Sequence, residues 1–420
     1  MKNRSLALIL AALSTLGPFS IDTYFASFPE LGNHFRVSEI QVQQTLSFYL
    51  IALAGMNLFH GALSDSYGRR RVILVSLGVY SGSALACVAA PSFYWLLFLR
   101  VIQGLAAGAG MIVSRAVIRD RFAGSDAQRM MAQVTVVSGL GPVIAPILGG
   151  WLHVWFGWRG PFAFLAAFGA VLWCTCWLGL KESLAPNAHQ TLHPGHLLRS
   201  YAEAICHPAF VLLCLALAFG GGGFLLYVAT APDVVLNILG LSKTQFGWLF
   251  LPIVSGLILG AAVSARAAGR VHATRLLKYG FTLMAIGASA NLAVNLCGIV
   301  RVPWAVLPLS LYTFGFSLLA PVATIQCLDI FPTRKGLASS IQGFFQTLIF
   351  ALIAGVVARF VYRSGVKHAY GLLIMMCLSW LAYGGYAALT SPANDTVLDS
   401  EIASEKPDIP GSGIDQAGKI

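Results

Sequence analysis

The sequence predicts an all-α protein that crosses a membrane twelve times. Of its 420 residues, 57% are hydrophobic and only 10% are charged, whereas a soluble domain carries about 25% charged residues. Apolar segments long enough to span a bilayer as helices recur along the chain. Such segments have to be helical, because hydrocarbon offers no partner to an unpaired backbone group. The expected spans are 5–28, 40–62, 72–90, 93–115, 129–152, 158–180, 208–231, 244–264, 276–298, 303–327, 338–360 and 368–390.

The positive charge of the chain is explained by orientation in a membrane. The formal net charge is +11, a value that favours nucleic-acid binding in a soluble protein. Here most lysines and arginines fall in short loops, and the loops on the side of the N-terminus carry the larger share. Because such loops stay in the cytoplasm, we expect both termini to lie inside and no nucleic-acid partner.

A polar break divides the apolar segments into two groups of six. Residues 1–180 and 208–390 are each predicted to form a six-helix bundle, joined by a cytoplasmic loop over 181–207. Residues 391–420 are acidic, and we expect them to form a disordered cytoplasmic tail. The loop histidines have a spacing that could bind metal, although we expect a solvated linker and no metal: His189, His193 and His196.

A short internal repeat indicates two halves of the same orientation. Residues 24–30 (YFASFPE) close the first segment, and residues 227–233 (YVATAPD) close the seventh. Residues 38–41 (SEIQ) and 242–245 (SKTQ) match in the same way. Two six-helix halves related by an axis along the membrane normal produce such a parallel repeat.

One acid lies inside the first apolar segment. Asp22 interrupts this run, and its counterpart in the second half is Leu225. A carboxylate at membrane depth costs about 2.5–3.5 kcal/mol on insertion scales, so it is retained where it is used or paired. Asp22 either reaches water near the helix end or takes up and releases a proton inside a transport path. We favour the second interpretation.

The fourth apolar segment carries a base at the same depth. Arg100 lies seven residues from the expected outer end at Phe93, and Asp22 lies seven residues from Pro29. Both are therefore about 10 Å deep at 1.5 Å per residue. We expect Asp22 and Arg100 to form a pair, because buried charges need partners. The alternative is that Arg100 extends to the outer lipid headgroups.

The loop after the second segment reads Gly61-Ala-Leu-Ser-Asp65-Ser-Tyr-Gly68-Arg69-Arg70-Arg71. Its glycines permit a tight turn, its arginines suit an anionic inner leaflet, and its acid can accept from a helix N-terminus. The spacing resembles the Gly-x-Leu-x-Asp-x-x-Gly-Arg-Arg/Lys signature of the major facilitator superfamily. This resemblance implies that the loop latches the two halves together in one conformational state. A positively charged inner loop without a gating role is the alternative.

The fifth apolar segment reads GLGPVIAPILGG over residues 139–150. Small residues let helices approach closely, and proline bends a helix. Gly141, Pro142, Pro146 and Gly149 resemble the motif associated with antiporters in the same superfamily. A role in packing alone is the alternative.

At a finer level the chain resembles the Bcr/CflA family of bicyclomycin and chloramphenicol resistance transporters. The residues that carry this resemblance are 20–24 (SIDTY) with Pro29, 115–120 (RAVIRD), 230–250 and 336–343 (GLASSIQG). Residues 100–104 (RVIQG) resemble the Arg-x-x-Gln-Gly motif of the superfamily. The resemblance covers about residues 1–390 and implies the major facilitator fold, with twelve helices in two six-helix bundles.

The family resemblance also implies a function. It indicates proton-coupled efflux of small hydrophobic or drug-like compounds by alternating access, with Asp22 as the proton site. The resemblance implies a multi-pass carrier of the bacterial inner membrane, expected to be a monomer in contact with membrane lipid and driven by the proton gradient without a cofactor. A proton symporter that takes up a small metabolite is the alternative, and an enzyme is not expected. The side chains expected to line a central cavity are Tyr24, Phe28, Tyr49, Asn57, Gln103, Met111, Tyr227, Tyr312 and Gln326.

Overall fold

The computed structural model describes residues 3–122, 124–184, 194–267, 270–332 and 334–390. Over these ranges helices are the only regular secondary structure, which confirms the predicted fold class. The acidic tail and two of the loop histidines, His189 and His193, lie outside the described residues. The elements in chain order are α1 (Asn3–Ser14), α2 (Leu16–Asp22), the 3₁₀ helix η1 (Phe25–Ser27), α3 (Phe28–Phe35), α4 (Glu39–Tyr67), α5 (Arg69–Val88), α6 (Phe93–Arg121), α7 (Gly124–Phe156), α8 (Arg159–Gly179), α9 (Pro194–Ile205), α10 (Pro208–Ala229), the π-helix η3 (Asp233–Ile238), α11 (Gly247–Ala267), α12 (Ala273–Leu296), α13 (Leu307–Asp329), α14 (Lys335–Leu352), the π-helix η4 (Ile353–Val357), α15 (Ala358–Val361) and α16 (Gly365–Leu389).

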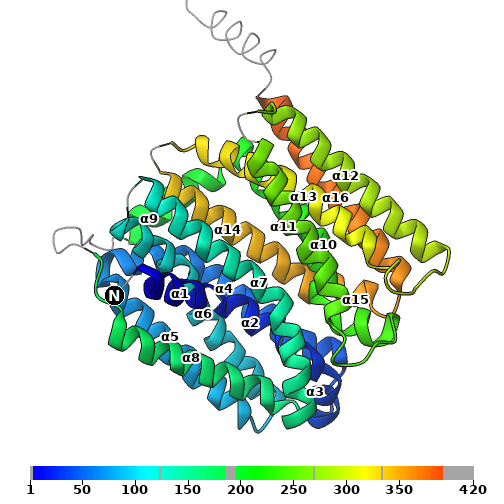
Figure 1. Ribbon diagram of the computed structural model, residues 1–420, viewed down its shortest axis with the longest axis horizontal. Coiled ribbons are helices and arrows are strands. Elements are labelled where there is room, and N and C mark those ends of the chain that lie inside the picture. Colours follow the sequence, from blue (N-terminus) through cyan, green and yellow to red (C-terminus); the bar gives the residue numbers. More distant parts are fainter. Residues whose placement is uncertain (1–2, 123, 185–193, 268–269, 333, 391–420) are drawn as a thin grey trace, which may run out of the picture.

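The helices form two groups that lie side by side. Figure 1 shows α1 to α8, coloured blue to green, next to α10 to α16, coloured green to orange. The main contacts between the groups join α4 to α14 and α7 to α11. We call the two groups the N-terminal half and the C-terminal half.

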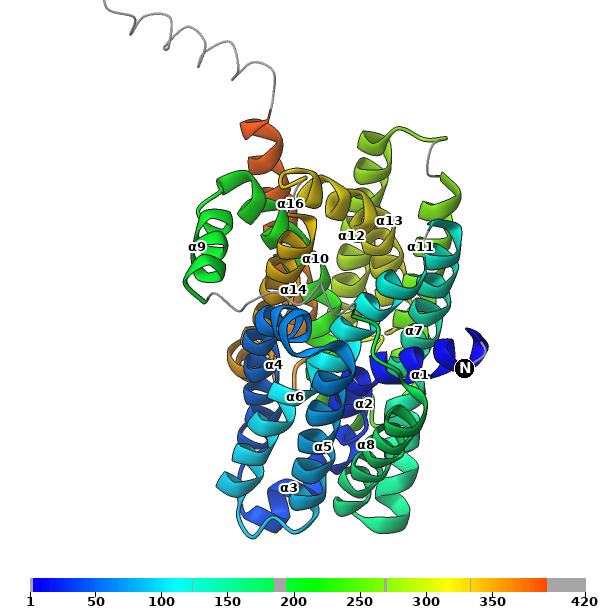
Figure 2. The same cartoon turned by 90° about the vertical axis from the view of Figure 1, so that its left-hand side faces the viewer.

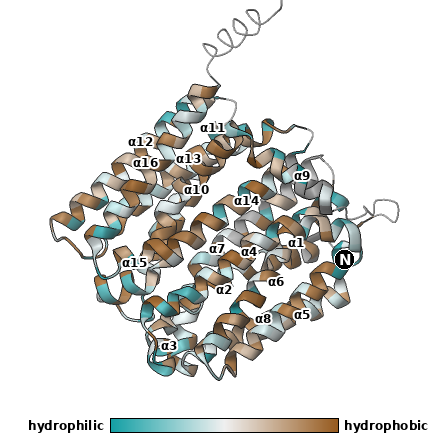
Figure 3. Ribbon diagram, turned by 180° about the vertical axis from the view of Figure 1, so that it is seen from behind, coloured by the Kyte–Doolittle hydropathy of each residue, from teal (hydrophilic) through white to brown (hydrophobic). Residues whose placement is uncertain are grey.

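Eleven of the described helical segments are long and apolar enough to cross a membrane. The one predicted span that is not among these eleven is 276–298. It corresponds to α12, whose mean hydropathy is lowered by polar residues such as Lys278, Asn291 and Asn295. This helix packs along α13 and α16, and buried Asn291 accepts a hydrogen bond from Tyr227 (2.6 Å). A polar side chain with an internal partner is tolerated in such a position. Figure 3 shows hydrophobic residues along most of each helix and hydrophilic residues mainly towards the helix ends.

The first apolar segment is broken. A single helix was expected over 5–28, but the chain forms α1, α2, η1 and α3 in succession. Pro18 and Pro29 explain the interruptions, because proline has no N–H to donate to the preceding turn. Thr23 also directs its hydroxyl to a carbonyl one turn back, which competes with the backbone pattern. As a result Asp22 is the last residue of a short helix.

The seventh apolar segment breaks at the equivalent point of the repeat. Helix α10 ends at Ala229, and the chain continues past Pro232 as the π-helix η3. Asp233 at the start of η3 is buried, and its carboxylate accepts from the backbone N–H of Arg363 (2.7 Å) and from Asn237 (2.9 Å). Both matched stretches interrupt a helix before their proline, but α2 ends before Tyr24, whereas α10 continues past Tyr227.

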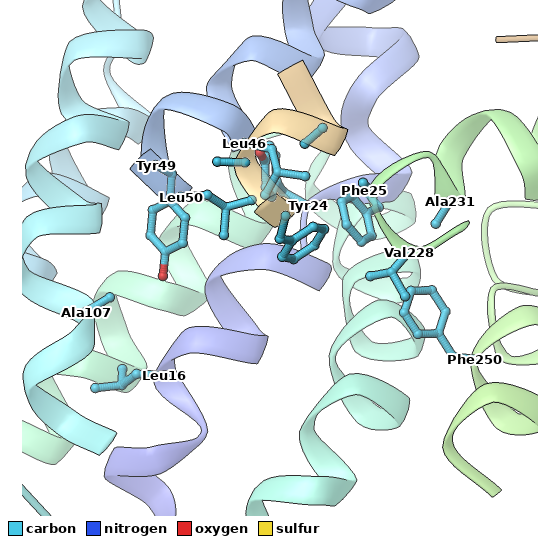
Figure 4. Close-up of a cluster of buried hydrophobic side chains, with 14 of the residues drawn as sticks. Leu16, Tyr24, Phe25, Leu46, Tyr49, Leu50, Ala107, Val228, Ala231 and Phe250 are labelled. Carbon is cyan, nitrogen blue, oxygen red and sulfur yellow. The ribbon is translucent and has the colours of Figure 1, made fainter. Parts of the chain in front are cut away.

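The halves meet at the ends of the helices that were predicted to face outwards. Gln43 donates to the carbonyl of Ala229 (2.7 Å), and Gln44 on the same helix donates to a carbonyl of η4 (3.3 Å). The rings of Phe25 and Phe250, 6.4 Å apart, face each other across the junction (Figure 4). The structure is thus closed at this end, which we call the predicted outer face. The connections at this face are 36–38, 89–92, 157–158, 239–246, 297–306 and 362–364.

The loop expected over 181–207 contains a helix. In α9, Tyr201 and Ala204 are buried, and the Tyr201 hydroxyl donates to the carbonyl of Leu58 in α4 (2.6 Å). Glu203 lies 3.2 Å from Arg334, which precedes α14. Figure 2 places α9 at the edge of the molecule beside α14 and α10. The expectation of a solvated linker is therefore wrong for these residues, because an apolar helix face packs against both halves.

Candidate functional site

Asp22 is buried within the N-terminal half. Its side chain is 3% exposed, and its Oδ1 atom has no hydrogen-bond partner among the described residues. A carboxylate at a helix C-terminus faces the negative end of the helix dipole, so α2 itself does not stabilise a charge there. Asp22 is therefore a buried carboxyl group with spare hydrogen-bonding capacity.

Arg100 is fully buried and is held by four groups. Its Nη1 donates to Gln103 Oε1 (2.6 Å), and its Nη2 donates to the carbonyl of Ser20 (3.0 Å). Its guanidinium carbon lies 4.6 Å from the ring centre of Tyr24 and 4.3 Å from that of Tyr49. Hydrogen bonds from charged donors contribute about 1.5–3 kcal/mol each, and desolvated cation–π contacts contribute about 2 kcal/mol. The alternative that Arg100 extends to the lipid headgroups is therefore wrong for this conformation.

The expected ion pair between Asp22 and Arg100 is not formed in this structure. Among the ion pairs of the described residues, none joins these two side chains, because the guanidinium is bound two residues earlier, at Ser20. The Ser20 carbonyl that binds Arg100 nevertheless lies within one turn of Asp22 in α2. Asp22 and Arg100, predicted to lie at the same depth, thus belong to one cluster but do not form an ion pair.

Several polar atoms of this cluster have no partner. Asp22 Oδ1, the Tyr49 hydroxyl, Arg100 Nε and Gln103 Nε2 are buried and unpaired within the described residues. An unsatisfied buried polar group costs about 1–3 kcal/mol. Several such atoms in one place indicate a site that binds something, because a stabilising core would satisfy them. We call the following residues the Arg100 cluster: Ser20, Asp22, Tyr24, Tyr49, Tyr80, Arg100 and Gln103.

The antiporter-like motif packs against the segment that carries Asp22. Gly149 of α7 lies so close to Thr23 that a Cβ atom there would be 1.8 Å from the Thr23 carbonyl oxygen. Gly141 likewise faces α2, where a Cβ would approach a proline side chain to 3.0 Å. Pro142 and Pro146 lie within α7 between these glycines. The motif therefore sets the position of the residue next to Asp22.

Replacing Gly149 with alanine is expected to impair transport by displacing Thr23. Overpacking costs about 1–3 kcal/mol, so we expect roughly a tenfold loss of rate, which corresponds to about 1.4 kcal/mol. The measurement is the initial transport rate in proteoliposomes containing equal amounts of folded protein. Gly139→Ala on the same helix is the matched control, because a Cβ at Gly139 meets open space. Equal rates for the two variants would contradict this role of Gly149.

The motif at residues 61–71, which covers the end of α4 and the start of α5, forms a network inside the N-terminal half. Arg69 pairs with Asp65, lies 3.0 Å from Asp120 of α6, and donates to the Ser64 hydroxyl (2.6 Å). Gly68 has φ +93°, a conformation that favours glycine. The network joins α4, α5 and α6 and does not latch the two halves in this conformation, which is closed at the predicted outer face instead.

A carboxylate that the sequence did not single out completes this network. Glu182 accepts from the backbone N–H groups of Arg69 and Arg70 (both 3.0 Å) and of the two residues that follow it. Partial burial raises the pKa of Glu182, but these four hydrogen bonds outweigh burial, so its pKa lies below the usual value. A Cβ at Gly68 would come within 2.7 Å of this carboxylate, whereas Gly61 faces open space.

The residues expected to line a cavity are spread over both halves. Tyr24, Tyr49 and Gln103 belong to the Arg100 cluster, and buried Phe28 packs on Tyr24 with ring centres 5.2 Å apart. Buried Asn57 of α4 lies against α6, and its Oδ1 has no partner among the described residues.

The other four candidates lie away from this cluster. Tyr312 donates to the carbonyl of Gly220 (2.9 Å), and Tyr227 to Asn291 as described above. Gln326 is half-buried beside Tyr383. Met111 is 39% exposed and is not part of the core.

Some residues of the site carried no signal in the sequence. Tyr80 of α5 is a single tyrosine in an apolar run, and its hydroxyl lies 2.5 Å from that of Ser20. His153 and Lys243 lie in different halves, yet their side-chain nitrogens are 2.9 Å apart. Only packing between helices brings such residues together.

Similar proteins are transporters of one superfamily. The family model of the Major Facilitator Superfamily matches residues 8–355. A bicyclomycin resistance protein homolog of Haemophilus influenzae is 25% identical and covers 90% of this chain and 94% of its own length. Multidrug resistance protein D of Escherichia coli is 25% identical over 90% of this chain and 96% of its own length.

A solved structure shares the fold. The xylose transporter XylE of E. coli, in a partially occluded inward open conformation, superposes with a TM-score of 0.67 at 16% identity and covers 93% of this chain and 100% of its own. With the family match, the helical architecture and the motifs in place, the chain belongs to the Major Facilitator Superfamily, as predicted from its sequence.

Proposed function

We propose that the protein exports small hydrophobic or drug-like compounds from the bacterial cytoplasm in exchange for protons, with Asp22 as the proton site. The observation that carries this proposal is the buried carboxyl of Asp22, whose Oδ1 has no partner among the described residues. It lies on the segment that binds Arg100 through the Ser20 carbonyl and packs against Gly141 and Gly149 of α7. The relatives named for bicyclomycin and multidrug resistance support export of compounds of this kind.

The transport cycle follows from the closed outer face. In this conformation substrate reaches the carrier from the cytoplasm or the inner leaflet. We assign Asp22 as protonated here, because a neutral carboxyl needs no cation and Arg100 stays bound to Ser20 and Gln103. Release of this proton inwards leaves a carboxylate that draws Arg100 towards it. The halves then rock, and protonation from the outside separates the pair and promotes release of substrate.

The proposed orientation in the membrane follows from the charge distribution. Both termini lie in the cytoplasm, as the excess of basic residues on that side favours. The carrier works as a monomer surrounded by lipid and uses the proton gradient as its energy source.

Transport in cells that lack their own pumps tests this function. Cells that produce the protein are expected to accumulate less of a chloramphenicol-like or cationic compound than control cells, and an uncoupler should abolish the difference. Higher accumulation would instead support the symporter alternative. Export that is insensitive to the uncoupler would refute proton coupling.

A further inference from the structure

A histidine bridges the two halves at the predicted outer face. His153, near the end of α7, is 5% exposed. Its Nε2 lies 2.9 Å from Nζ of Lys243, which belongs to the C-terminal half. On the other side of the ring, Nδ1 lies 3.0 Å from the Ser27 hydroxyl and 3.4 Å from a carboxylate oxygen of Glu30. The imidazole thus joins two groups of the N-terminal half to one group of the C-terminal half.

The contact with Lys243 requires a neutral imidazole. A lysine ammonium can only donate hydrogen bonds, so Nε2 of His153 has to accept. The ring proton is then on Nδ1, where it faces Ser27 and Glu30. A protonated imidazole has N–H on both nitrogens and no acceptor left. Protonation would therefore replace a hydrogen bond between the halves by two cations 2.9 Å apart.

The repulsion would act where the halves are in tight contact. Gly150, three residues before His153 on α7, packs against the main chain of Lys243, where a Cβ would lie 2.2 Å from the carbonyl oxygen. The remaining polar links at this face are few within the described residues. They include the bond from Gln43 described above and an ion pair of 3.8 Å between Glu39 and Arg363.

Two partners of the buried imidazole are exposed at the predicted outer face. The Glu30 side chain is 41% exposed, and Lys243 is exposed as well. The charged groups that face the ring are Glu30 from α3 and Lys243 from the other half, while Ser27 from η1 is neutral. Glu30 attracts an imidazolium and Lys243 repels it, so the added proton is accommodated best when Lys243 moves away.

We propose that His153 is a second proton-binding site of the carrier and that its protonation separates the two halves at the predicted outer face. A proton from the external solution adds to the Nε2 lone pair, Lys243 keeps its own proton, and only the hydrogen bond between them is lost. The inference rests on the proposed proton-coupled export and deepens it, because acidity outside would then open the path by which Asp22 is protonated.

Distance measurements between spin labels on the two halves test the proposal. One label is placed on native Cys297, which is exposed in the C-terminal half, and the other on Asn33→Cys in α3, with the other exposed cysteines replaced by serine. The full chain in lipid nanodiscs is measured from about pH 8 to about pH 5, on either side of the usual histidine pKa of about 6.5. The distance is expected to lengthen on acidification.

Variants of the bridge give opposite expectations. His153→Gln can still accept from Lys243 but gains no charge, so the distance should stay short throughout. His153→Arg carries a permanent charge, and the distance should be long even at the higher pH. Should that variant fold poorly, Lys243→Met provides the same test, because without the second cation acidification should no longer lengthen the distance. Lengthening that persists unchanged in His153→Gln or in Lys243→Met would overturn the proposal.

Two matched controls separate this role from other effects. His368→Asn removes another buried histidine near the same face, whose ring bonds only within its own half, and its pH response should match the wild type. Asp22→Asn should keep the pH-dependent opening even though export is lost. If His368→Asn lost the pH-dependent opening while His153→Gln retained it, the pH-sensitive group would be His368 and the proposal would be overturned. If the Asp22→Asn variant opened on acidification and also exported normally, the proposed role of Asp22 would be refuted, but the proposed role of His153 would stand.

Discussion

Replacing Asp22 with asparagine is expected to abolish proton-driven export while leaving the protein folded. Asparagine has nearly the same shape, and the Oδ1 atom of Asp22 has no hydrogen bond to lose among the described residues. The amide cannot bind and release a proton, so the coupled step loses its carrier. We expect the export rate driven by an imposed pH gradient to fall by about tenfold or more, equivalent to at least about 1.4 kcal/mol. Proteoliposomes that report substrate and proton fluxes together provide the measurement.

A second buried acid is the control for this substitution. Asp233 is fully buried in the C-terminal half, but its oxygens are bonded to Arg363 and Asn237. Asp233→Asn is expected to lower thermal stability, because it weakens hydrogen bonds to a charged group, and to leave the ratio of protons to substrate unchanged. Undiminished proton-coupled export by Asp22→Asn would show that the proton site lies elsewhere.

Replacing Arg100 is expected to impair both export and stability, and lysine should not rescue it. A planar guanidinium reaches Ser20 and Gln103 while it lies between two tyrosine rings. An ammonium is a compact charge that cannot reproduce this arrangement. Each hydrogen bond from a charged donor contributes about 1.5–3 kcal/mol, and Arg100 makes two of them. Arg100→Ala and Arg100→Lys should therefore both unfold at clearly lower temperatures. Thermal unfolding in detergent and the export rate are measured in parallel.

A surface arginine with similar contacts is the matched control. Arg159 donates to the carbonyl of Val88 (3.1 Å) and lies 4.4 Å from the ring centre of Trp158, but it is exposed. Substitutions at such sites usually change stability by less than about 0.5 kcal/mol. Arg159→Lys should therefore behave like the wild type. If Arg100→Lys were equally well tolerated, the buried cluster would have no special role in transport.

Local properties of the chain were sufficient for the fold class and for the depth of the main site residues. Hydrophobicity and segment length identify membrane helices because a bilayer accepts only backbones that satisfy their own hydrogen bonds. Counting residues from the helix ends placed Asp22 and Arg100 at one level, and in the structure Arg100 binds the Ser20 carbonyl within one turn of Asp22. The breaks in the first helix were not predicted, although Pro18 and Pro29, which explain them, are visible in the sequence.

The sequence by itself therefore determined that this protein is a twelve-helix member of its superfamily with a costly acid in its first helix. Only the tertiary structure decided that Arg100 binds the carbonyl of Ser20, that Gly149 touches Thr23, and that His153 meets Lys243 across the halves. The physical reason is that residue spacing sets the depth of a side chain along a helix. The rotation of each helix, the position of its breaks and the approach of its neighbours come from packing, which joins residues far apart in the chain.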